Sequence, residues 1–150
     1  MNKRTLFIVS ACAFFVLAGC KHKINQQVVE SYADGLPKVT EEVVISNEGD
    51  TVMTRETYFF PGEKKYMEKQ FNSKGQPDGV WVSWYENGNK NSQGTYVNGK
   101  WHGVYRVWYP NGNLRYTGEY DNGVRVGVWK FYDSTGTLVN KEDLNLNINR

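Results

Sequence analysis

The sequence is poor in the residues from which cross-links and most active sites are built. Its 150 residues include only two cysteines, two histidines and four prolines. Two cysteines cannot form a disulfide framework, and a structural zinc site needs three or four nitrogen or sulfur ligands. The charge is nearly balanced, with 18 Lys+Arg against 16 Asp+Glu. These shortages exclude a disulfide-stapled scaffold and a zinc module, and they leave few candidates for catalysis.

Long apolar runs are also missing. The longest run, residues 6–18, has 13 residues, whereas a membrane-spanning helix needs about 20. It follows Lys3 and Arg4, and a short cationic start before such a run is typical of a secretory signal peptide. The run ends in Leu17-Ala18-Gly19-Cys20, which resembles the lipobox of bacterial lipoproteins. An ordinary secretory signal with a chance cysteine is the alternative.

The lipobox resemblance implies a location in the cell. In lipoproteins the cysteine receives a diacylglycerol and the chain is cut directly before it. We therefore expect a signal peptide over 1–19, a lipid anchor on Cys20 and a lipidated tether over 20–26. Lys21 stands where aspartate would favour inner-membrane retention, which implies the outer membrane of a bacterial cell envelope.

Removal of residues 1–19 changes the charge and the thiol count. Lys3 and Arg4 leave with the signal, so that 16 basic residues remain against 16 acidic ones. This balance gives no compositional reason to expect nucleic-acid binding. Cys12 leaves as well and Cys20 carries lipid, so no thiol is expected to serve in a disulfide or in catalysis.

A repeat of 24 residues organises the rest of the chain. Residues 79–102 and 103–126 share 11 identities in 24 positions without a gap, and a third copy starts at residue 127. Weaker copies start at Tyr32 and Phe60, and terminal repeats of an array are usually atypical. We expect degenerate β repeats or a cap over 27–59, regular repeats over 60–138, and a polar tail or edge over 139–150.

The first two of these copies each contain two Asn-Gly pairs, at 87–88 and 98–99 and again at 111–112 and 122–123. Asn-Gly between β-prone segments predicts a two-residue hairpin turn of type I′, in which both residues have positive φ. Two such turns per copy predict a continuous antiparallel meander, and a ring is expected to lie across each strand glycine that it opposes. The predicted pairs are Trp81–Gly94, Tyr85–Lys90, Ser92–Tyr105 and Tyr105–Gly118.

This register divides the side chains between two faces of the sheet. One face, here the aromatic face, is expected to be the core side, covered by curling of the sheet or by residues 24–59. Its predicted members are Trp81, Tyr85, Tyr96, Trp101, Tyr105, Val107, Tyr109, Leu114, Tyr116, Tyr120, Trp129 and Phe131. The other, here the second face, is mostly polar. Its predicted members are Asn91, Gln93, Thr95, His102, Arg106, Arg115, Thr117, Glu119 and Lys130, together with Trp84, Trp108 and Tyr132.

The repeat motif points to a known family. Read from residue 79, the pattern Gly-x-Trp-x-x-Trp-Tyr-x-Asn-Gly-x-x-x-x-x-Gly-x-Tyr-x-Asn-Gly resembles the MORN repeat, in the bacterial variant that is labelled as an antitoxin-type family. The resemblance covers 60–138 and, loosely, 32–59. It implies an all-β fold, a single-layer antiparallel β-meander of hairpin repeats, and a role as an adaptor or scaffold. Pro110 and Asp133 depart from the motif, so the copy that contains Asp133 is expected to be the least regular.

Residues for catalysis or metal binding are scarce. His22 lies two residues from Cys20, and His102 follows a predicted turn on the second face, where solvation is expected. The acidic neighbours at 41–42 and 142–143 are interpreted as charged edges rather than as acid/base pairs. We predict that the protein is not an enzyme and that it has no catalytic residue, no cofactor and no metal site.

Three rings on the second face form the candidate binding site. Trp84, Trp108 and Tyr132 recur every 24 residues, two strands and therefore about 10 Å apart. In one interpretation they pack against neighbouring valines, with Arg115 over Trp108. In the other they form an exposed ladder that binds a partner together with Arg106 and Arg115.

Three functions remain open at this point. The first is a lipid-anchored, non-catalytic envelope protein that acts as a protein–protein interaction or scaffold module for an unidentified protein partner. The second, suggested by the family label, is an immunity or antitoxin-type lipoprotein that neutralises a toxin. The third is a glycan- or choline-binding module, because aromatic–glycine hairpin repeats also build such modules. Their Trp-Trp or Tyr-Tyr doublets form cation cages, whereas the doublet here is Trp-Tyr.

Overall fold

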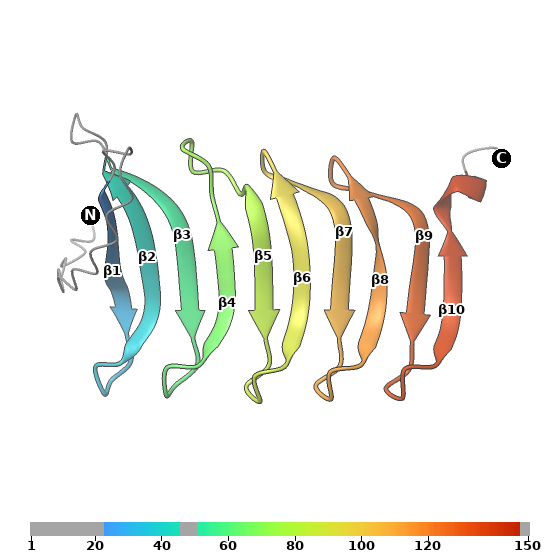
Figure 1. The fold of residues 1–150 in the computed structure, drawn as a ribbon, viewed down its shortest axis with the longest axis horizontal. Coiled ribbons are helices and arrows are strands. Elements are labelled where there is room, and N and C mark those ends of the chain that lie inside the picture. Colours follow the sequence, from blue (N-terminus) through green and yellow to red (C-terminus); the bar gives the residue numbers. More distant parts are fainter. Residues whose placement is uncertain (1–22, 46–50, 148–150) are drawn as a thin grey trace.

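The computed structural model describes residues 23–45 and 51–147. These residues form ten strands in one sheet, and each strand pairs antiparallel with the next one along the chain (Figure 1). The all-β, single-layer meander predicted from the repeat is therefore confirmed. The elements are β1 (Lys23–Ser31), β2 (Pro37–Ile45), β3 (Thr51–Phe59), β4 (Lys65–Gln70), β5 (Gly79–Trp84), β6 (Lys90–Val97), β7 (Lys100–Trp108), β8 (Leu114–Asp121), β9 (Val124–Tyr132), β10 (Leu138–Asp143) and the 3₁₀-helix η1 (Leu144–Asn147).

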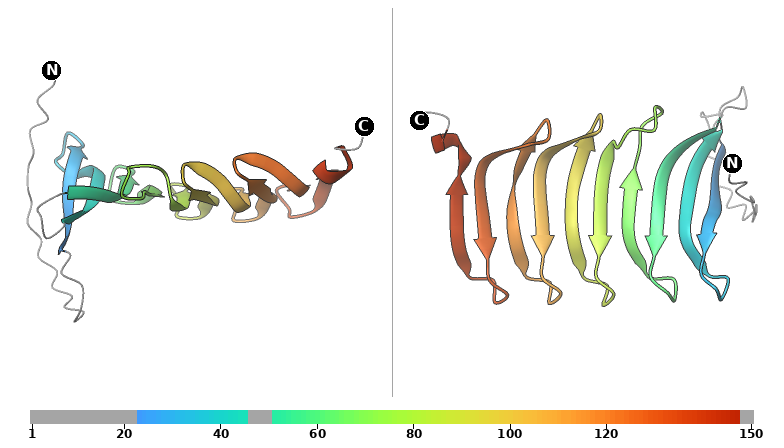
Figure 2. Two further views of the ribbon diagram at one scale, coloured as in Figure 1. Left: turned by 90° about the horizontal axis from the view of Figure 1, so that it is seen from above. Right: turned by 180° about the vertical axis from the view of Figure 1, so that it is seen from behind.

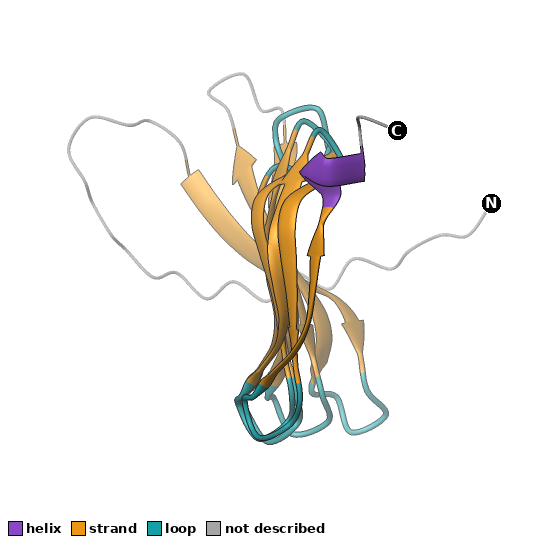
Figure 3. Ribbon diagram, turned by 90° about the vertical axis from the view of Figure 1, so that its right-hand side faces the viewer, coloured by secondary structure: helices purple, strands orange, loops and turns teal. Residues whose placement is uncertain are grey.

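The sheet is one layer thick throughout the described part of the chain. Seen from above and from its end, it is a twisted ribbon of strands with no second layer over either face (Figures 2 and 3). Strands β1 to β3, expected to cover the aromatic face, instead extend the sheet sideways beyond β4, so this expectation was wrong. Among the described residues, no helix has the length and apolar character needed to cross a membrane.

The ends of the sheet refine the expected boundaries. Strand β1 begins at Lys23, so the segment interpreted as a tether, 20–26, is already part of the sheet over its second half. At the other end, residues 138–143 form the edge strand β10, within the part of the chain interpreted as a polar tail or edge. The predicted signal peptide and the predicted lipid anchor on Cys20 lie outside the described residues.

Two kinds of turn alternate from β5 to β10. The pairs 98–99 and 122–123 form type I′ turns as predicted, with φ of 49° and 82° at Asn98 and Gly99. The turn predicted at 87–88 was wrong. There the Tyr85 N–H donates to the Asn89 carbonyl and the Gly88 N–H donates to the Tyr85 carbonyl, which closes a three-residue loop. Only the glycine of that pair has positive φ, as expected for a type I turn followed by a left-handed residue.

The three-residue loops shift the strand register near the lower edge of the sheet in Figure 1. Lys90 pairs with Trp84 rather than with Tyr85, and a bulge then restores the predicted pairing of Trp81 with Gly94. The equivalent bulge in β8 sets Leu114 directly opposite Trp108. Since directly opposed side chains share a face, Leu114 belongs to the second face and not to the aromatic face, where it was predicted.

A second irregularity explains two strand glycines. Between the pairs Thr95–His102 and Gln93–Arg106, the single residue Gly94 faces three residues of β7, so Ser92 pairs with Val107 and not with Tyr105. The same shift occurs opposite Gly118 in β9. Because the register moves by two residues and the side-chain period is two, the face of every later residue is preserved.

The rings that cover these glycines come from the following strand rather than from the preceding one. A Cβ atom on Gly94 would lie 2.5 Å from the Tyr105 ring and 2.7 Å from the Trp101 ring, and one on Gly118 would overlap the Trp129 ring. The predicted pairs of Gly94 with Trp81 and of Gly118 with Tyr105 are present. The expected covering rings were wrong, because the extra residues of β7 and β9 place their own rings over the glycines.

The core consists of one chain of contacting rings on the aromatic face. Neighbouring rings have centroid separations of 3.8 to 6.3 Å, and the most buried members of this face are Trp129 and Val107, which are 2% and 6% exposed. Aromatic pairs at such distances add stability beyond the area that they bury. The rings are Phe71, Trp81, Tyr96, Trp101, Tyr105, Tyr116, Tyr120, Trp129 and Phe131.

Side chains at the lower edge of the sheet join each repeat to the next. The Tyr109 hydroxyl donates to the Tyr132 carbonyl at 3.0 Å, and the Nδ2 groups of Asn111 and Asn113 donate to the Ser134 carbonyl at 2.7 and 2.8 Å. The preceding repeat makes the same set of bonds one unit earlier. Its donors are Tyr85, Asn87 and Asn89, and its acceptors are the carbonyls of Trp108 and Pro110.

Candidate interaction surface

The second face is ordered in rows that run across the strands. In one such row, directly paired residues follow one another over the five strands β6 to β10. On β5 the row continues with Val82, which pairs with Gln93. The row consists of Gln93 (β6), Arg106 (β7), Thr117 (β8), Lys130 (β9) and Lys141 (β10). Arg106, Lys130 and Lys141 are exposed, which leaves their charges in contact with solvent.

The three candidate rings lie in the neighbouring row, nearer the lower edge of the sheet. Trp84, Trp108 and Tyr132 pair with Lys90, Leu114 and Leu138 respectively. All three rings are half-buried. Each ring therefore packs against its neighbours and still keeps part of its surface accessible, which leaves both interpretations open.

The cations around these rings differ from the prediction. The ammonium group of Lys90 lies over the Trp108 ring, 5.8 Å from its centroid. Arg115, expected at that place, instead stacks over Tyr109 at 5.6 Å. The cause is the bulge between Leu114 and Tyr116, which displaces Arg115 from the regular alternation of the strand. Arg106, the other arginine predicted to bind a partner with the rings, lies in the row that also contains Lys130 and Lys141.

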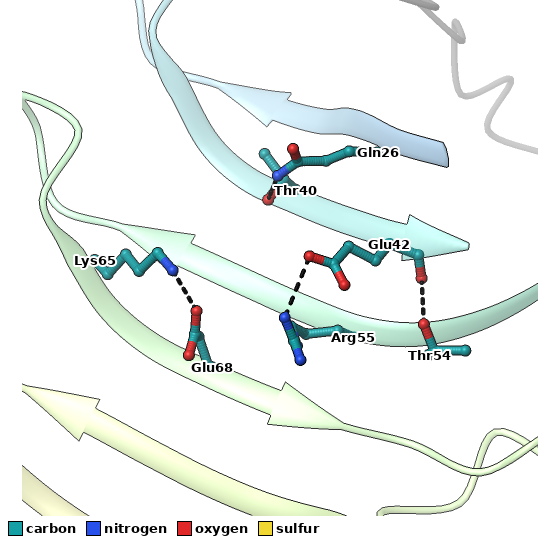
Figure 4. A network of polar contacts seen from close by, with 7 residues as sticks. All are labelled: Gln26, Thr40, Glu42, Thr54, Arg55, Lys65 and Glu68. Carbon is teal, nitrogen blue, oxygen red and sulfur yellow. Dashed lines mark hydrogen bonds and ion pairs between the residues drawn. The ribbon is translucent and has the colours of Figure 1, made fainter. Parts of the chain in front are cut away.

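Ion pairs gather elsewhere on the sheet. Figure 4 shows polar contacts on β1 to β4, including the ion pair between Arg55 and Glu42 at 3.3 Å and that between Lys65 and Glu68 at 2.5 Å. Near the upper edge, His102 Nδ1 lies 3.4 Å from Asp121, and both side chains are more than half exposed. This exposure agrees with the predicted solvation of His102.

The N-terminal end of the aromatic face carries a polar cluster beside the buried valines Val39 and Val43. The Tyr58 hydroxyl donates to Glu56 at 2.7 Å and accepts from the Lys69 ammonium group at 3.0 Å. Burial, together with the hydrogen bond to Glu56, raises the pKa of Tyr58 far above its ordinary value. Burial also raises the pKa of Tyr105. Both phenols are therefore neutral at physiological pH, and this arrangement is suited to packing rather than to proton transfer.

Metal ligands do not cluster in the part of the chain that the structure describes. Within residues 23–45 and 51–147 there is no group of three or more histidine, cysteine, aspartate or glutamate side chains that could hold an ion. What the second face offers is a broad surface with cations, half-buried rings and exposed valines such as Val80 and Val104, which are 38% and 40% exposed. Such a surface is suited to contact with another molecule.

Comparison with known families agrees with this geometry. The family described as MORN repeat variant matches residues 77–98, 101–122 and 125–144. These three segments are similar to MORN repeat variants and are called the MORN repeats below. Each match includes two neighbouring strands, so a MORN repeat here is one hairpin of the meander. No curated protein matches the chain.

The third MORN repeat is regular despite its departure from the motif. Asp133 takes the place of the tyrosine that begins the loop in the two preceding MORN repeats. Its carboxylate accepts hydrogen bonds from the Thr135 hydroxyl and from the N–H groups of Thr135 and Thr137. These bonds lower the pKa of Asp133, the side-chain bond from Thr135 most of all. The loop therefore keeps the geometry of its neighbours with a different set of bonds.

The loop geometry of the MORN repeats extends beyond the matched residues. The Tyr32 N–H donates to the Leu36 carbonyl, and the Tyr32 hydroxyl donates to the Phe59 carbonyl at 2.7 Å, as in the regular repeats. The loop from Phe60 to Lys64 keeps the bond from the Phe60 N–H to the Lys64 carbonyl, but its glycine stands one position early, and both Gly62 and Glu63 have positive φ, of 87° and 65°. The weak copies at Tyr32 and Phe60 are thus structural repeats of the same kind.

Proposed function

We propose that this protein is a lipid-anchored, non-catalytic interaction module of the bacterial cell envelope, which holds a protein partner on an open face of its sheet. The observation that carries the proposal is the single-layer architecture, because both faces of a ten-stranded sheet are available to a partner. MORN repeats are modules that often serve in binding or scaffolding, and three of them occupy the C-terminal half of the chain.

The anchor is supported by the sequence around Cys20. A cationic start, a short apolar run and the Leu-Ala-Gly-Cys sequence are the features that bacterial lipoproteins share. Two or more acyl chains on one residue give stable attachment, since each buried CH₂ contributes about 0.8 kcal/mol. We therefore place the protein in the envelope, at the outer membrane.

Replacement of the acylated residue tests the anchor. In cells fed a radiolabelled fatty acid, the natural chain should be labelled and should sediment with membranes, and Cys20→Ser should lose the label and keep its signal peptide. Cys12→Ser is the matched control, because it changes a cysteine inside the apolar run and should leave labelling intact. Labelling that survives in Cys20→Ser would contradict the anchor.

Crosslinking from the second face tests the interaction. A photo-crosslinking amino acid at Val104, which is exposed on that face, should give one discrete protein adduct in intact cells. The same amino acid at Val97, exposed near the type I′ turn, serves as the comparison. The absence of any protein adduct from either position would refute a protein-binding role, whereas an adduct from Val97 alone would move the contact to the upper edge of the sheet.

A further inference from the structure

A stripe of cations crosses the C-terminal half of the second face. It consists of Lys90, Arg106, Lys130 and Lys141, all exposed, and is called the basic stripe below. Direct pairing links Arg106 to Lys130 through Thr117, and Lys130 to Lys141. Lys90 joins the stripe because its ammonium group donates to the side-chain oxygen of Gln93, the residue paired with Arg106, at 2.7 Å.

Among the described residues, no acidic side chain forms an ion pair with a cation of the basic stripe. Such pairs are formed instead by Lys38, Arg55, Lys65, Lys69 and Arg125. Lys130 and Lys141 even lie directly opposite each other on neighbouring strands. Like charges in that position destabilise a sheet. An anion bound along the stripe would remove this repulsion.

The stripe is also narrow, which limits what can bind to it. Acidic side chains occupy the next row toward the upper edge, where Glu119 pairs with Val104 and Asp143 pairs with Val128. On the lower side, over β7 to β10, lie the uncharged side chains of Trp108, Leu114, Tyr132 and Leu138. A flat anionic surface such as a membrane, or a nucleic-acid duplex, would meet the acidic row as well as the cations. A single polypeptide strand laid along the stripe would not.

We propose that the basic stripe binds an acidic polypeptide segment of the partner, laid across β6 to β10. Four strand spacings of about 4.8 Å give a length of about 19 Å, which corresponds to about six extended residues. The carboxylates of the segment face the stripe, and its apolar side chains cover the half-buried rings of Trp108 and Tyr132. This inference rests on the proposed function, since it names the chemistry of the partner.

Binding of a defined acidic peptide tests the inference. The probe is a short fluorescein-labelled oligoglutamate, added to the purified full chain in neutral detergent micelles, with fluorescence anisotropy as the readout. Arg106→Glu/Lys130→Glu should weaken binding at least about tenfold, because it reverses the centre of the stripe. Lys74→Glu/Lys100→Glu makes the same change in net charge at exposed positions outside the stripe, and it should leave the affinity within about twofold of the natural chain.

Neutral replacements keep the test decisive if charge reversal disturbs folding. Arg106→Gln/Lys130→Gln removes the repulsion between Lys130 and Lys141, so it should fold at least as stably as the natural chain while still losing affinity for oligoglutamate. A stable, folded neutral variant that binds the peptide as well as the natural chain overturns the proposal.

Other polyanions are distinguished by competition. Micelles doped with phosphatidylglycerol, or oligothymidylate of equal charge, should displace the labelled peptide less well than unlabelled oligoglutamate does. If either competes better, the stripe is a membrane or nucleic-acid site and the proposal is overturned. If Arg106→Glu/Lys130→Glu still gives the Val104 crosslink of the natural chain, the partner does not use the stripe, and the proposed interaction stands without this inference.

Discussion

Two strand glycines are as important to this fold as the aromatic residues that pack on them. Gly94 and Gly118 have no positive φ, so their role is not conformational freedom but the missing Cβ atom. Trp101 and Tyr105 lie against the bare backbone of the first, and Trp129 lies against that of the second. In a sheet without a second layer, rings laid flat over glycine are the main way to remove apolar surface from water.

Adding one methyl group at Gly118 should disturb this packing. Gly118→Ala would place a Cβ atom inside the Trp129 ring, so the ring must move out of its buried position. We expect the free energy of unfolding, measured by urea titration, to fall by about 1–3 kcal/mol. Glu119→Ala, which changes the exposed neighbour of Gly118, should alter it by less than about 0.5 kcal/mol. Equal stabilities of the two variants would show that the ring does not lie over the glycine.

The two faces should respond differently to loss of a ring. Trp129→Ala removes a side chain that is only 2% exposed, and such changes cost about 3–5 kcal/mol. Trp108→Ala removes a half-buried ring and should cost roughly 1–2 kcal/mol, leaving a folded protein at room temperature. Thermal unfolding followed by tryptophan fluorescence compares them. A larger loss for Trp108→Ala would reverse our assignment of the core face.

At the scale of the element, the lower loops depend on bonds to the next repeat. Tyr85 and Tyr109 donate to carbonyls 23 residues ahead. Phe60 stands at the same loop position without a hydroxyl. The hairpins are thus joined to one another at their tips as well as through their strands.

This difference gives a reciprocal pair of substitutions. Tyr109→Phe should lower the free energy of unfolding by about 0.5–1.5 kcal/mol, since the Tyr132 carbonyl loses its donor. Phe60→Tyr should raise it by up to the same amount, because the new hydroxyl can reach the end of β5 as Tyr85 reaches the end of β7. Urea titration of both variants tests the pair. Unchanged stability in Tyr109→Phe would mean that water replaces the bond without loss.

The turns show what the sequence could and could not predict. Asn98-Gly99 and Asn87-Gly88 are the same dipeptide, yet only the first forms a two-residue turn. In the second, the Asn87 side chain accepts from the Asn89 N–H and donates to the carbonyl of Pro110, in the following repeat. A bond to a residue so far ahead cannot be inferred from the dipeptide. The meander was predictable because each copy carries two turn signals and therefore two strands. The two faces were predictable because side chains alternate along each strand, and a register shift of two residues leaves this alternation unchanged.

The proposed binding surface could be predicted from the sequence less completely than the fold. The sequence identified Arg106 and the three rings of the second face, but Lys90 was hidden by the bulge that follows it. Lys141 was hidden because residues 139–150 carried no repeat signal, although they contain a regular strand that aligns Lys141 with Lys130. Arg115 was misplaced for the same reason as Leu114. Bulges depend on tertiary pairing and leave little trace in a single sequence.

At the scale of the whole molecule, each hairpin contacts only its neighbours along the sheet. Stability in such an array is close to a sum of repeat and interface contributions. The bonds between repeats follow the same rule, since Gly99 and Gly123 donate to Pro77 and Trp101, one repeat earlier. Deletion of one complete 24-residue repeat should therefore leave every remaining repeat with the same types of contact to its neighbours.

Deletion of residues 103–126 tests this modularity. His102 would then precede Gly127, and the first copy (79–102) and the third copy would meet in the register that the lost copy used. We expect a folded β protein by far-UV circular dichroism, with a lower melting temperature because one interface is lost. Deletion of 103–114 removes a single strand, reverses the direction of every later strand and should not fold. A shortened chain that is unfolded in both cases would show that the repeats are not interchangeable.

The order of strands also makes the length of the sheet proportional to the number of strands. Because β1 to β10 follow one another without a crossover, every step along the sequence of strands is a step in one direction in space (Figure 1). Nine spacings of about 4.8 Å place β10 about 43 Å from β1. If Cys20 holds the β1 end at the membrane, Lys141 stands at the far end of that span. Each repeat gained or lost in evolution would then shift the reach of the protein into its compartment by about 10 Å, while its binding surface kept the same chemistry.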